Sequence, residues 1–176
     1  MNKPLAAVIL AAGKGTRMDS DLPKVLHKVG ERAMIVHVID TARNLGTEKI
    51  IAVLGYKYEI VQKALENESV ECALQLKQLG TAHAVMQSQD LLSDFQGNVL
   101  ILYGDVPLIK VETLANLLSI HSETDTQSTI LTTNLPDPTG YGRIIRNKDD
   151  SLKKIVEEKD ATDEERQIAE INSGIY

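Results

Sequence analysis

Short apolar runs alternate with amphipathic stretches along the first two thirds of this 176-residue chain, and this alternation limits its fold more than any other feature. Leu5–Ala12 is an unbroken apolar run that ends at Gly13, and the segment Asn98–Tyr103 contains Val-Leu-Ile-Leu. Short runs of this kind, bounded by turn residues, are typical of strands buried on both faces. The sequence therefore predicts an α/β fold with a mostly parallel central sheet and helices on both of its faces.

The stretches between these runs supply the expected helices. Between positions 33 and 45 apolar residues recur at helical spacing, and Gly46 follows as a plausible C-terminal stop. We expect further helices at 58–65, 81–92 and 111–122, and further strands at 49–54, 70–76 and 128–134. Beyond Pro136 we expect strands at 143–146, 152–158 and 169–176, with a short charged segment at 161–167. The prediction is one domain with a small C-terminal β flank.

Charge and composition exclude several classes of function. The chain has 19 Lys and Arg against 25 Asp and Glu, a net charge of −6, which argues against a general binder of nucleic acid or anionic membranes. Its longest apolar run is far short of the ~20 residues that span a bilayer, and no signal peptide opens the chain. The lone Cys72 cannot form an internal disulfide, so we expect a cytoplasmic protein.

The loop after the first apolar run carries residues suited to binding an anion. It reads Leu10-Ala-Ala-Gly13-Lys-Gly-Thr-Arg17-Met-Asp-Ser-Asp-Leu-Pro-Lys24. Gly13 and Gly15 lack a Cβ, so backbone amides there can approach a phosphate closely, and Lys14, Arg17 and Lys24 add three cations. For the glycines alone, a plain turn is the alternative. The loop has neither the third glycine of a dinucleotide fingerprint nor the Gly-Lys-Ser/Thr of a P-loop.

Asp105 follows the apolar strand expected at 98–103, separated from it by Gly104 alone. In an open parallel sheet, residues at the carboxyl ends of the strands face one ligand crevice, which the glycine loop also faces. A carboxylate there suits Mg²⁺, which typically takes one or two carboxylates together with substrate phosphates. Asp105 alone could equally form a turn or cap a helix; its pairing with the glycine loop favours a metal ligand.

No other catalytic constellation stands out in the sequence. The four histidines, His27, His37, His83 and His121, have no metal-ligand spacing, and no Gly-x-Ser-x-Gly elbow is present. His83 is close to Gly80 and Thr81 in sequence, and we expect it to be structural.

The loop pattern, Leu-Ala-Ala-Gly-x-Gly-Thr-Arg-Met followed by Leu-Pro-Lys, resembles the signature of nucleotidyltransferases that activate sugar phosphates. Further stretches are similar to the N-acetylglucosamine-1-phosphate uridylyltransferases: Gln75-Leu-Lys-Gln-Leu-Gly80-Thr81, Asp137-Pro-Thr-Gly-Tyr-Gly142-Arg, Val156-Glu157-Glu-Lys-Asp, and Glu170-Ile-Asn172-Ser-Gly. The resemblance covers residues 5–176. It implies a Rossmann-like nucleotidyltransferase fold, with residues 1–176 forming a transferase domain that is incomplete at its C-terminus.

The resemblance implies a reaction as well. UTP and N-acetylglucosamine 1-phosphate would give UDP-N-acetylglucosamine and pyrophosphate, with Mg²⁺ as cofactor, for the synthesis of peptidoglycan and lipopolysaccharide precursors. Two alternatives stay open: a related enzyme that uses UTP and glucose 1-phosphate, and a nucleotide-binding fragment without catalysis.

Residue roles follow from the resemblance too. Arg17 and Lys24 would be the catalytic cations, and Asp105 the metal ligand. Gly142, Glu157 and Asn172 would surround the sugar. Ten residues would bind the nucleotide: Leu10, Ala11, Ala12, Gly13, Gly15, Lys24, Gln75, Gly80, Thr81 and Tyr103. Among these, Gln75 and the backbone of Gly80-Thr81 would hold the uracil, because a side-chain amide offers both a donor and an acceptor.

Three features of the family are expected to be missing from this sequence. The family's second metal ligand, an Asn, comes downstream of Tyr176, as does the last part of the transferase domain. The acetyltransferase β-helix domain, which usually carries trimerisation, is also absent. We therefore expect no acetyl transfer from this chain, a homotrimer only for the full-length family protein, and loose Mg²⁺ binding.

Overall fold

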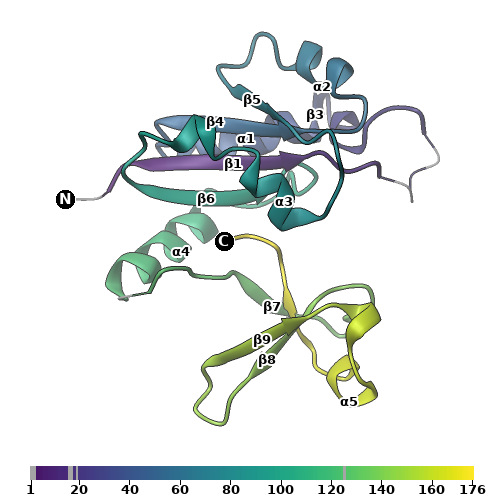
Figure 1. Cartoon of the computed structure of the whole chain (residues 1–176), viewed down its shortest axis with the longest axis vertical. Helices are drawn as coiled ribbons and strands as arrows, with labels where there is room; N and C mark the ends of the chain where they lie inside the picture. Colours follow the sequence, from purple (N-terminus) through teal and green to yellow (C-terminus); the bar gives the residue numbers. More distant parts are fainter. Residues whose placement is uncertain (1–2, 16–17, 19, 125) are drawn as a thin grey trace. The chain divides into compact units, whose positions relative to one another are not determined.

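The computed structural model describes residues 3–15, 18, 20–124 and 126–176 (Figure 1). The chain divides into two compact units, Met1–Ser119 and Ile120–Tyr176, which are described separately. The elements of the first unit, in chain order, are β1 (Leu5–Ala11), η1 (Lys24–Leu26), β2 (Lys28–Val29), β3 (Arg32–Ala33), α1 (Met34–Asn44), β4 (Lys49–Leu54), α2 (Tyr58–Ala64), β5 (Glu71–Leu74), α3 (Thr81–Met86), η2 (Asp90–Leu92) and β6 (Asn98–Tyr103). Helix α4 (Val111–Glu123) runs into the second unit.

A parallel sheet forms the centre of the first unit, with strand order β5-β4-β1-β6. All seven residues of β1 are buried, which explains why that segment has no polar face. From β1 the chain adds β4 and then β5 on one side, and β6 then pairs with the other side of β1. Because such crossovers are right-handed, this reversal puts helices on both faces of the sheet, with α1 behind it and α3 in front in Figure 1. The predicted α/β architecture is confirmed.

Helix α1 shows how the hydrophobic spacing fixes the packing. Ile35, Val38, Ile39 and Ala42 are fully buried, at intervals that bring them onto one face of the helix. The helix ends where predicted, because Gly46 follows with a φ of +83°, a conformation that glycine adopts without strain.

Two local features of the first unit differ from expectation. The helix expected at 81–92 ends at Met86, and a separate 3₁₀ turn, η2, follows. The buried Ser88 hydroxyl donates to the Val85 carbonyl at 2.7 Å, and such local bonds compete with helix continuation. The hairpin β2–β3 was not predicted, because its two strands have only two residues each, too few to show an alternating pattern.

The second unit contains a four-stranded antiparallel sheet with the order β7-β10-β8-β9. Its elements are β7 (Thr132–Asn134), β8 (Arg143–Arg146), β9 (Leu152–Val156), η3 (Glu158–Asp160), α5 (Asp163–Arg166) and β10 (Glu170–Asn172). The strand expected at 128–134 thus belongs to this sheet instead of continuing the parallel one. It pairs antiparallel with β10, and the Thr132 hydroxyl donates to the Glu170 carboxylate at 2.7 Å.

No helix in the described part of the chain is long and apolar enough to cross a membrane.

Candidate functional site

A cavity of about 440 Å³ opens in the first unit at the carboxyl ends of β1 and β6. This is where the strand order reverses, the usual ligand position in open α/β sheets. The residues that line it are Leu10, Ala11, Ala12, Gly13, Gly15, Met18, Lys24, Val25, Gln75, Gln78, Gly80, Thr81, Ala84, Tyr103 and Asp105. They include all ten residues predicted to bind the nucleotide and the predicted metal ligand. Arg17 lies outside the described residues.

The glycine loop contacts Lys24 at close range. Gly15 has a φ of +61°, and a Cβ added there would lie 2.8 Å from the Lys24 Cβ. No larger residue fits without moving the lysine. Lys24 itself begins η1, whose next two residues, Val25 and Leu26, are buried and anchor the turn. The backbone thus determines where the Lys24 side chain starts, close to the mouth of the cavity.

Lys24 and Asp105 form an ion pair inside this cavity, with 2.7 Å between Lys24 Nζ and Asp105 Oδ2. Gly104 brings Asp105 close to β1: its N–H donates to the Leu10 carbonyl at 2.9 Å, and an added Cβ would lie 3.2 Å from Val25 Cγ1. Both charged side chains are partly exposed, 38% for Lys24 and 27% for Asp105. They therefore remain accessible to a ligand that carries charge of its own.

Asp105 is the one acidic side chain among the described residues that line the cavity. The described residues hold no cluster of three His, Cys, Asp or Glu side chains that could bind a metal by themselves. A single carboxylate fits Mg²⁺ when substrate phosphates complete the coordination. The arrangement suits a cation that arrives together with a phosphate ligand better than a permanently bound metal.

Another part of the cavity wall carries two glutamines. Gln75 is only 4% exposed; its backbone N–H donates to the Leu54 carbonyl at 2.7 Å, which ties it to the end of β4. Its side-chain Nε2 lies 3.0 Å from the Gly80 carbonyl and 3.0 Å from His83 Nδ1. Gln78 was given no role from the sequence, yet its Nε2 donates to the Ala12 carbonyl at 2.9 Å and so joins this wall to the start of the glycine loop.

Gly80 and Thr81 complete this wall. Gly80 has a φ of +100°, and its carbonyl accepts from Ala84 N–H at 3.1 Å, so it makes the turn into α3. The Tyr103 hydroxyl lies 3.4 Å from Thr81 Oγ1, which links the end of β6 to the first residue of α3. Gln75, Gly80, Thr81 and Tyr103 therefore lie around one space, although they are distant in sequence.

The three residues predicted to bind the sugar lie together in the second unit. The Asn172 N–H donates to the Gly142 carbonyl at 2.8 Å, and a Cβ on Gly142 would lie 3.3 Å from Glu157 Oε1. Any other residue at position 142 would press on that carboxylate. The Asn172 side chain is held at both ends: Nδ2 donates to the Tyr176 hydroxyl at 2.7 Å, and Oδ1 accepts from Gly174 N–H at 2.9 Å.

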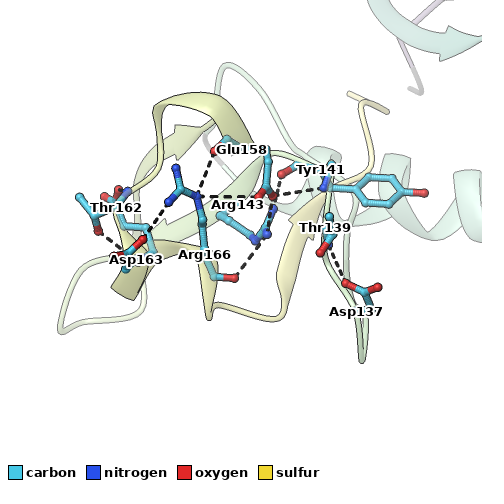
Figure 2. A network of polar contacts seen from close by, with 10 residues as sticks. Asp137, Thr139, Tyr141, Arg143, Glu158, Thr162, Asp163 and Arg166 are labelled. Carbon is cyan, nitrogen blue, oxygen red and sulfur yellow. Dashed lines mark hydrogen bonds and ion pairs between the residues drawn. The ribbon is translucent and has the colours of Figure 1, made fainter. Parts of the chain in front are cut away.

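A buried arginine, Arg143, links the segments that carry these three residues; we call Arg143 and its hydrogen-bond partners the Arg143 frame. Figure 2 shows the Arg143 guanidinium between the Tyr141 carbonyl, the Glu158 carboxylate and the Arg166 carbonyl. Arg143 is 1% exposed, and its Nη2 donates to Glu158 Oε2 at 2.7 Å. The same carboxylate accepts from Gly140 N–H, and both interactions hold the pKa of Glu158 below its ordinary value. The frame thus fixes the turn before Gly142 and the residue after Glu157.

The remaining candidates show no reactive arrangement. Cys72 is half-buried, and this burial raises the pKa of its thiol, so the thiolate is disfavoured. His37 and His121 make local hydrogen bonds, to the Val29 carbonyl and the Thr129 hydroxyl. These contacts agree with structural roles for both.

Comparisons with known proteins give the same family as the sequence motifs. A family model described as nucleotidyl transferase matches residues 6–176. The chain is 55% identical over 172 residues to the bifunctional protein GlmU of Alkaliphilus metalliredigens, covering 98% of this chain and 37% of that protein. It is 51% identical over 170 residues to the bifunctional protein GlmU of Streptococcus uberis, and equally to that of Bacillus licheniformis, in each case covering 97% of this chain. The chain spans about 37% of the length of these curated relatives.

Proposed function

Because the chain belongs to the nucleotidyl transferase family, we propose that it transfers the uridylyl group of UTP to N-acetylglucosamine 1-phosphate. The products would be UDP-N-acetylglucosamine, a precursor of the cell wall, and pyrophosphate. The observation that carries this proposal is the cavity at the ends of β1 and β6, which is lined by a glycine loop, a cation, a carboxylate and a buried amide. These groups match the phosphates and the base of a nucleoside triphosphate in chemistry.

The phosphate end of UTP would lie against the glycine loop. Gly13 and Gly15 leave their backbone amides open to an anion, and the Lys24 ammonium would turn from Asp105 toward the phosphate oxygens. Arg17 belongs to the same loop, and we propose it as a second cation there. Positive charge on these residues would offset the charge that develops on the departing pyrophosphate.

The reaction joins a phosphate oxygen of the sugar phosphate to the α-phosphorus of UTP and breaks the bond to the β-phosphate bridging oxygen. A phosphate monoester has a second pKa near ~6, so it is largely dianionic at neutral pH and needs no strong general base. The enzyme's residues need only align the two phosphates and neutralise their charge. Lys24 would meet that requirement directly, and Asp105 through a bound magnesium ion, without a nucleophilic pair such as Ser–His.

Asp105 would hold a magnesium ion through its carboxylate once Lys24 has turned away. A bound Mg²⁺ would neutralise charge on the phosphate oxygens and make pyrophosphate a better leaving group. The fit rests on the donor: a hard carboxylate oxygen at the edge of the cavity that is exposed enough to meet a phosphate-bound cation.

The sugar would be bound by Gly142, Glu157 and Asn172 of the second unit. Their mutual contacts support this role: Gly142 leaves room at the Glu157 carboxylate, which can accept hydrogen bonds from sugar hydroxyls. We further propose that the protein is cytoplasmic, that it has no nucleic-acid or membrane partner, and that only the full-length family protein forms a homotrimer.

The test is pyrophosphate release by the purified chain with UTP and a panel of sugar phosphates. We expect the highest kcat/KM with N-acetylglucosamine 1-phosphate, and a loss of turnover in Asp105→Asn. The exposed Asp94 gives a matched control, Asp94→Asn, which should behave as the parent chain. A preference for glucose 1-phosphate would show the related enzyme instead. Tight UTP binding by calorimetry without turnover would show a nucleotide-binding module.

A further inference from the structure

We propose that His83 is a positioning residue that holds the Gln75 amide with its oxygen toward the nucleotide cavity, facing position 3 of the base, so that the site selects a pyrimidine with an N–H at that position. This inference rests on the proposed function, because it concerns how the nucleotide site recognises its base. The observation behind it is the position of Gln75 Nε2, which lies 3.0 Å from both the Gly80 carbonyl and His83 Nδ1.

The Gly80 carbonyl decides which way the Gln75 amide faces. A carbonyl oxygen can only accept a hydrogen bond, so the group 3.0 Å from it must be the Nε2 donor. Rotation of the amide by half a turn would bring Oε1 against the Gly80 oxygen, two acceptors with no proton between them. Because Gln75 is 4% exposed, water cannot readily compensate such a loss.

This orientation in turn fixes the tautomer of His83. A neutral imidazole accepts at one nitrogen and donates at the other. Its Nδ1 faces Gln75 Nε2 at 3.0 Å, and its Nε2 faces Gln87 Nε2 at 3.4 Å. Both neighbours are donors, since the Gln87 nitrogen also donates to the His83 carbonyl at 2.9 Å. The ring can accept only once, and the shorter contact is where a second donor would cost more. His83 therefore accepts at Nδ1 and carries its proton on Nε2.

Both N–H groups of the Gln75 amide are then engaged, one by Gly80 and one by His83. Among the described residues, nothing donates a hydrogen bond to Gln75 Oε1, and this atom is not among the buried unpaired ones. Gln75 lines the cavity, so its oxygen is the polar atom left for a ligand.

An amide that presents only its oxygen to a base can accept a hydrogen bond from it but cannot donate one. When position 3 of the base faces that oxygen, uracil donates from its N3–H, whereas N3 of cytosine has no proton and would oppose it. A free glutamine could rotate and serve either base. With its nitrogen engaged by His83 and Gly80, Gln75 cannot rotate without losing two hydrogen bonds. Selection of uracil over cytosine is thus a property of the three residues together.

Calorimetric titration of the full chain with UTP and with CTP tests this role through the ratio of the two dissociation constants. His83→Leu removes the ring acceptor, and we expect the preference for UTP to fall by about tenfold or more. His83→Asn keeps an oxygen near the position of Nδ1, so it should restore most of the preference. His121→Leu removes a histidine of the second unit, whose Nδ1 contacts Thr129, and should leave the ratio unchanged.

A second measurement covers the case in which His83→Leu does not fold. Nitrogen-15 NMR of the parent chain should show His83 protonated at Nε2 and unprotonated at Nδ1; a proton on Nδ1 would overturn the proposal. An unchanged UTP-to-CTP ratio in a folded His83→Leu would overturn it too. Failure of the proposed function looks different: the parent chain itself would then bind UTP no more tightly than CTP.

Discussion

Gly15 and Gly30 separate two effects that a glycine substitution can have. Both have positive φ, +61° and +64°, so alanine at either position strains the backbone, by about 1 kcal/mol. Only at Gly15 would the new Cβ also press on Lys24, at 2.8 Å, while Gly30 has open space around it. We expect both variants to lose stability, measured by urea unfolding, and Gly15→Ala to lose more because of this overlap.

Nucleotide binding should distinguish the same two variants. Gly15→Ala displaces the Lys24 side chain from Asp105, so UTP affinity should fall at least about tenfold by calorimetry, as expected for a lost charged contact. Gly30→Ala should bind UTP as the parent does. Equal affinities in both variants would mean that Lys24 does not contact the nucleotide.

The Arg143 guanidinium holds several elements of the second unit together, because it joins the turn before β8, the segment after β9 and the end of α5. Replacing it with methionine keeps the apolar stem but leaves the Glu158 carboxylate and two carbonyls without their donor. We expect hydrogen exchange to accelerate about tenfold or more in Arg143→Met at two amides: that of Gly140, which donates to the Glu158 carboxylate, and that of Asn172, which donates to the Gly142 carbonyl.

Arg146→Met is the matched control for that experiment. Arg146 lies on the same strand but is partly exposed and pairs with Glu170, outside the Arg143 frame. Its loss should leave the exchange of the Gly140 amide near that of the parent. If Arg146→Met accelerated exchange at both amides as much as Arg143→Met, the effect of Arg143 would reflect only the general stability of β8.

The antiparallel sheet should also be sensitive to acid. Arg143 lowers the pKa of Glu158, Lys154 that of Glu165, and Arg146 that of Glu170, in each case below the ordinary value of 4.5. In the unfolded chain these carboxylates take up protons first as the pH falls, so the folded state loses stability there. We expect the urea midpoint, followed in the second unit, to be constant above about pH 5 and to fall toward about pH 3. Glu158→Gln should flatten this dependence, and the exposed Glu164→Gln should not.

How well an element could be predicted depended on how much of it is buried. β4 and β6 begin and end at the predicted residues, because continuous apolar runs allow few other positions in a covered sheet. The end of α3 was predicted wrongly, and the partner of β7 was not predicted. Both depend on contacts that a local pattern does not contain: the Ser88 hydroxyl in the first case and the pairing with β10 in the second.

At the scale of the whole molecule, the two units carry different parts of the proposed reaction. The nucleotide cavity is lined by residues of the first unit, and Gly142, Glu157 and Asn172 belong to the second. Glu157→Gln should therefore raise KM for the sugar phosphate, by about tenfold or more, because a charged acceptor is lost. The dissociation constant for UTP alone should be unchanged. Asp163→Asn, at an exposed position of the same unit, is the control for both quantities.

The candidate site was predictable where it follows strands and not where it depends on the far ends of side chains. The glycine loop and Asp105 follow β1 and β6 directly, so the parallel topology alone brings them together. Gln78 reaches Ala12, 66 positions earlier, and nothing in the local sequence indicates that contact. His83 was expected to be structural, and its contact with Gln75 becomes visible only once α3 is packed beside β1.

In the ion pair between Lys24 and Asp105, each side chain is the counter-ion of the other. A divalent cation that binds alone would have to displace the Lys24 ammonium from the Asp105 carboxylate. A triphosphate that binds alone would draw Lys24 away and leave the Asp105 carboxylate beside the negatively charged phosphates. A magnesium–nucleotide complex carries both a cation and phosphate anions. Asp105 can therefore exchange Lys24 for the magnesium ion, while Lys24 exchanges Asp105 for the phosphates. Under the proposed function, the cation and the nucleotide should therefore each bind more tightly as one complex than separately.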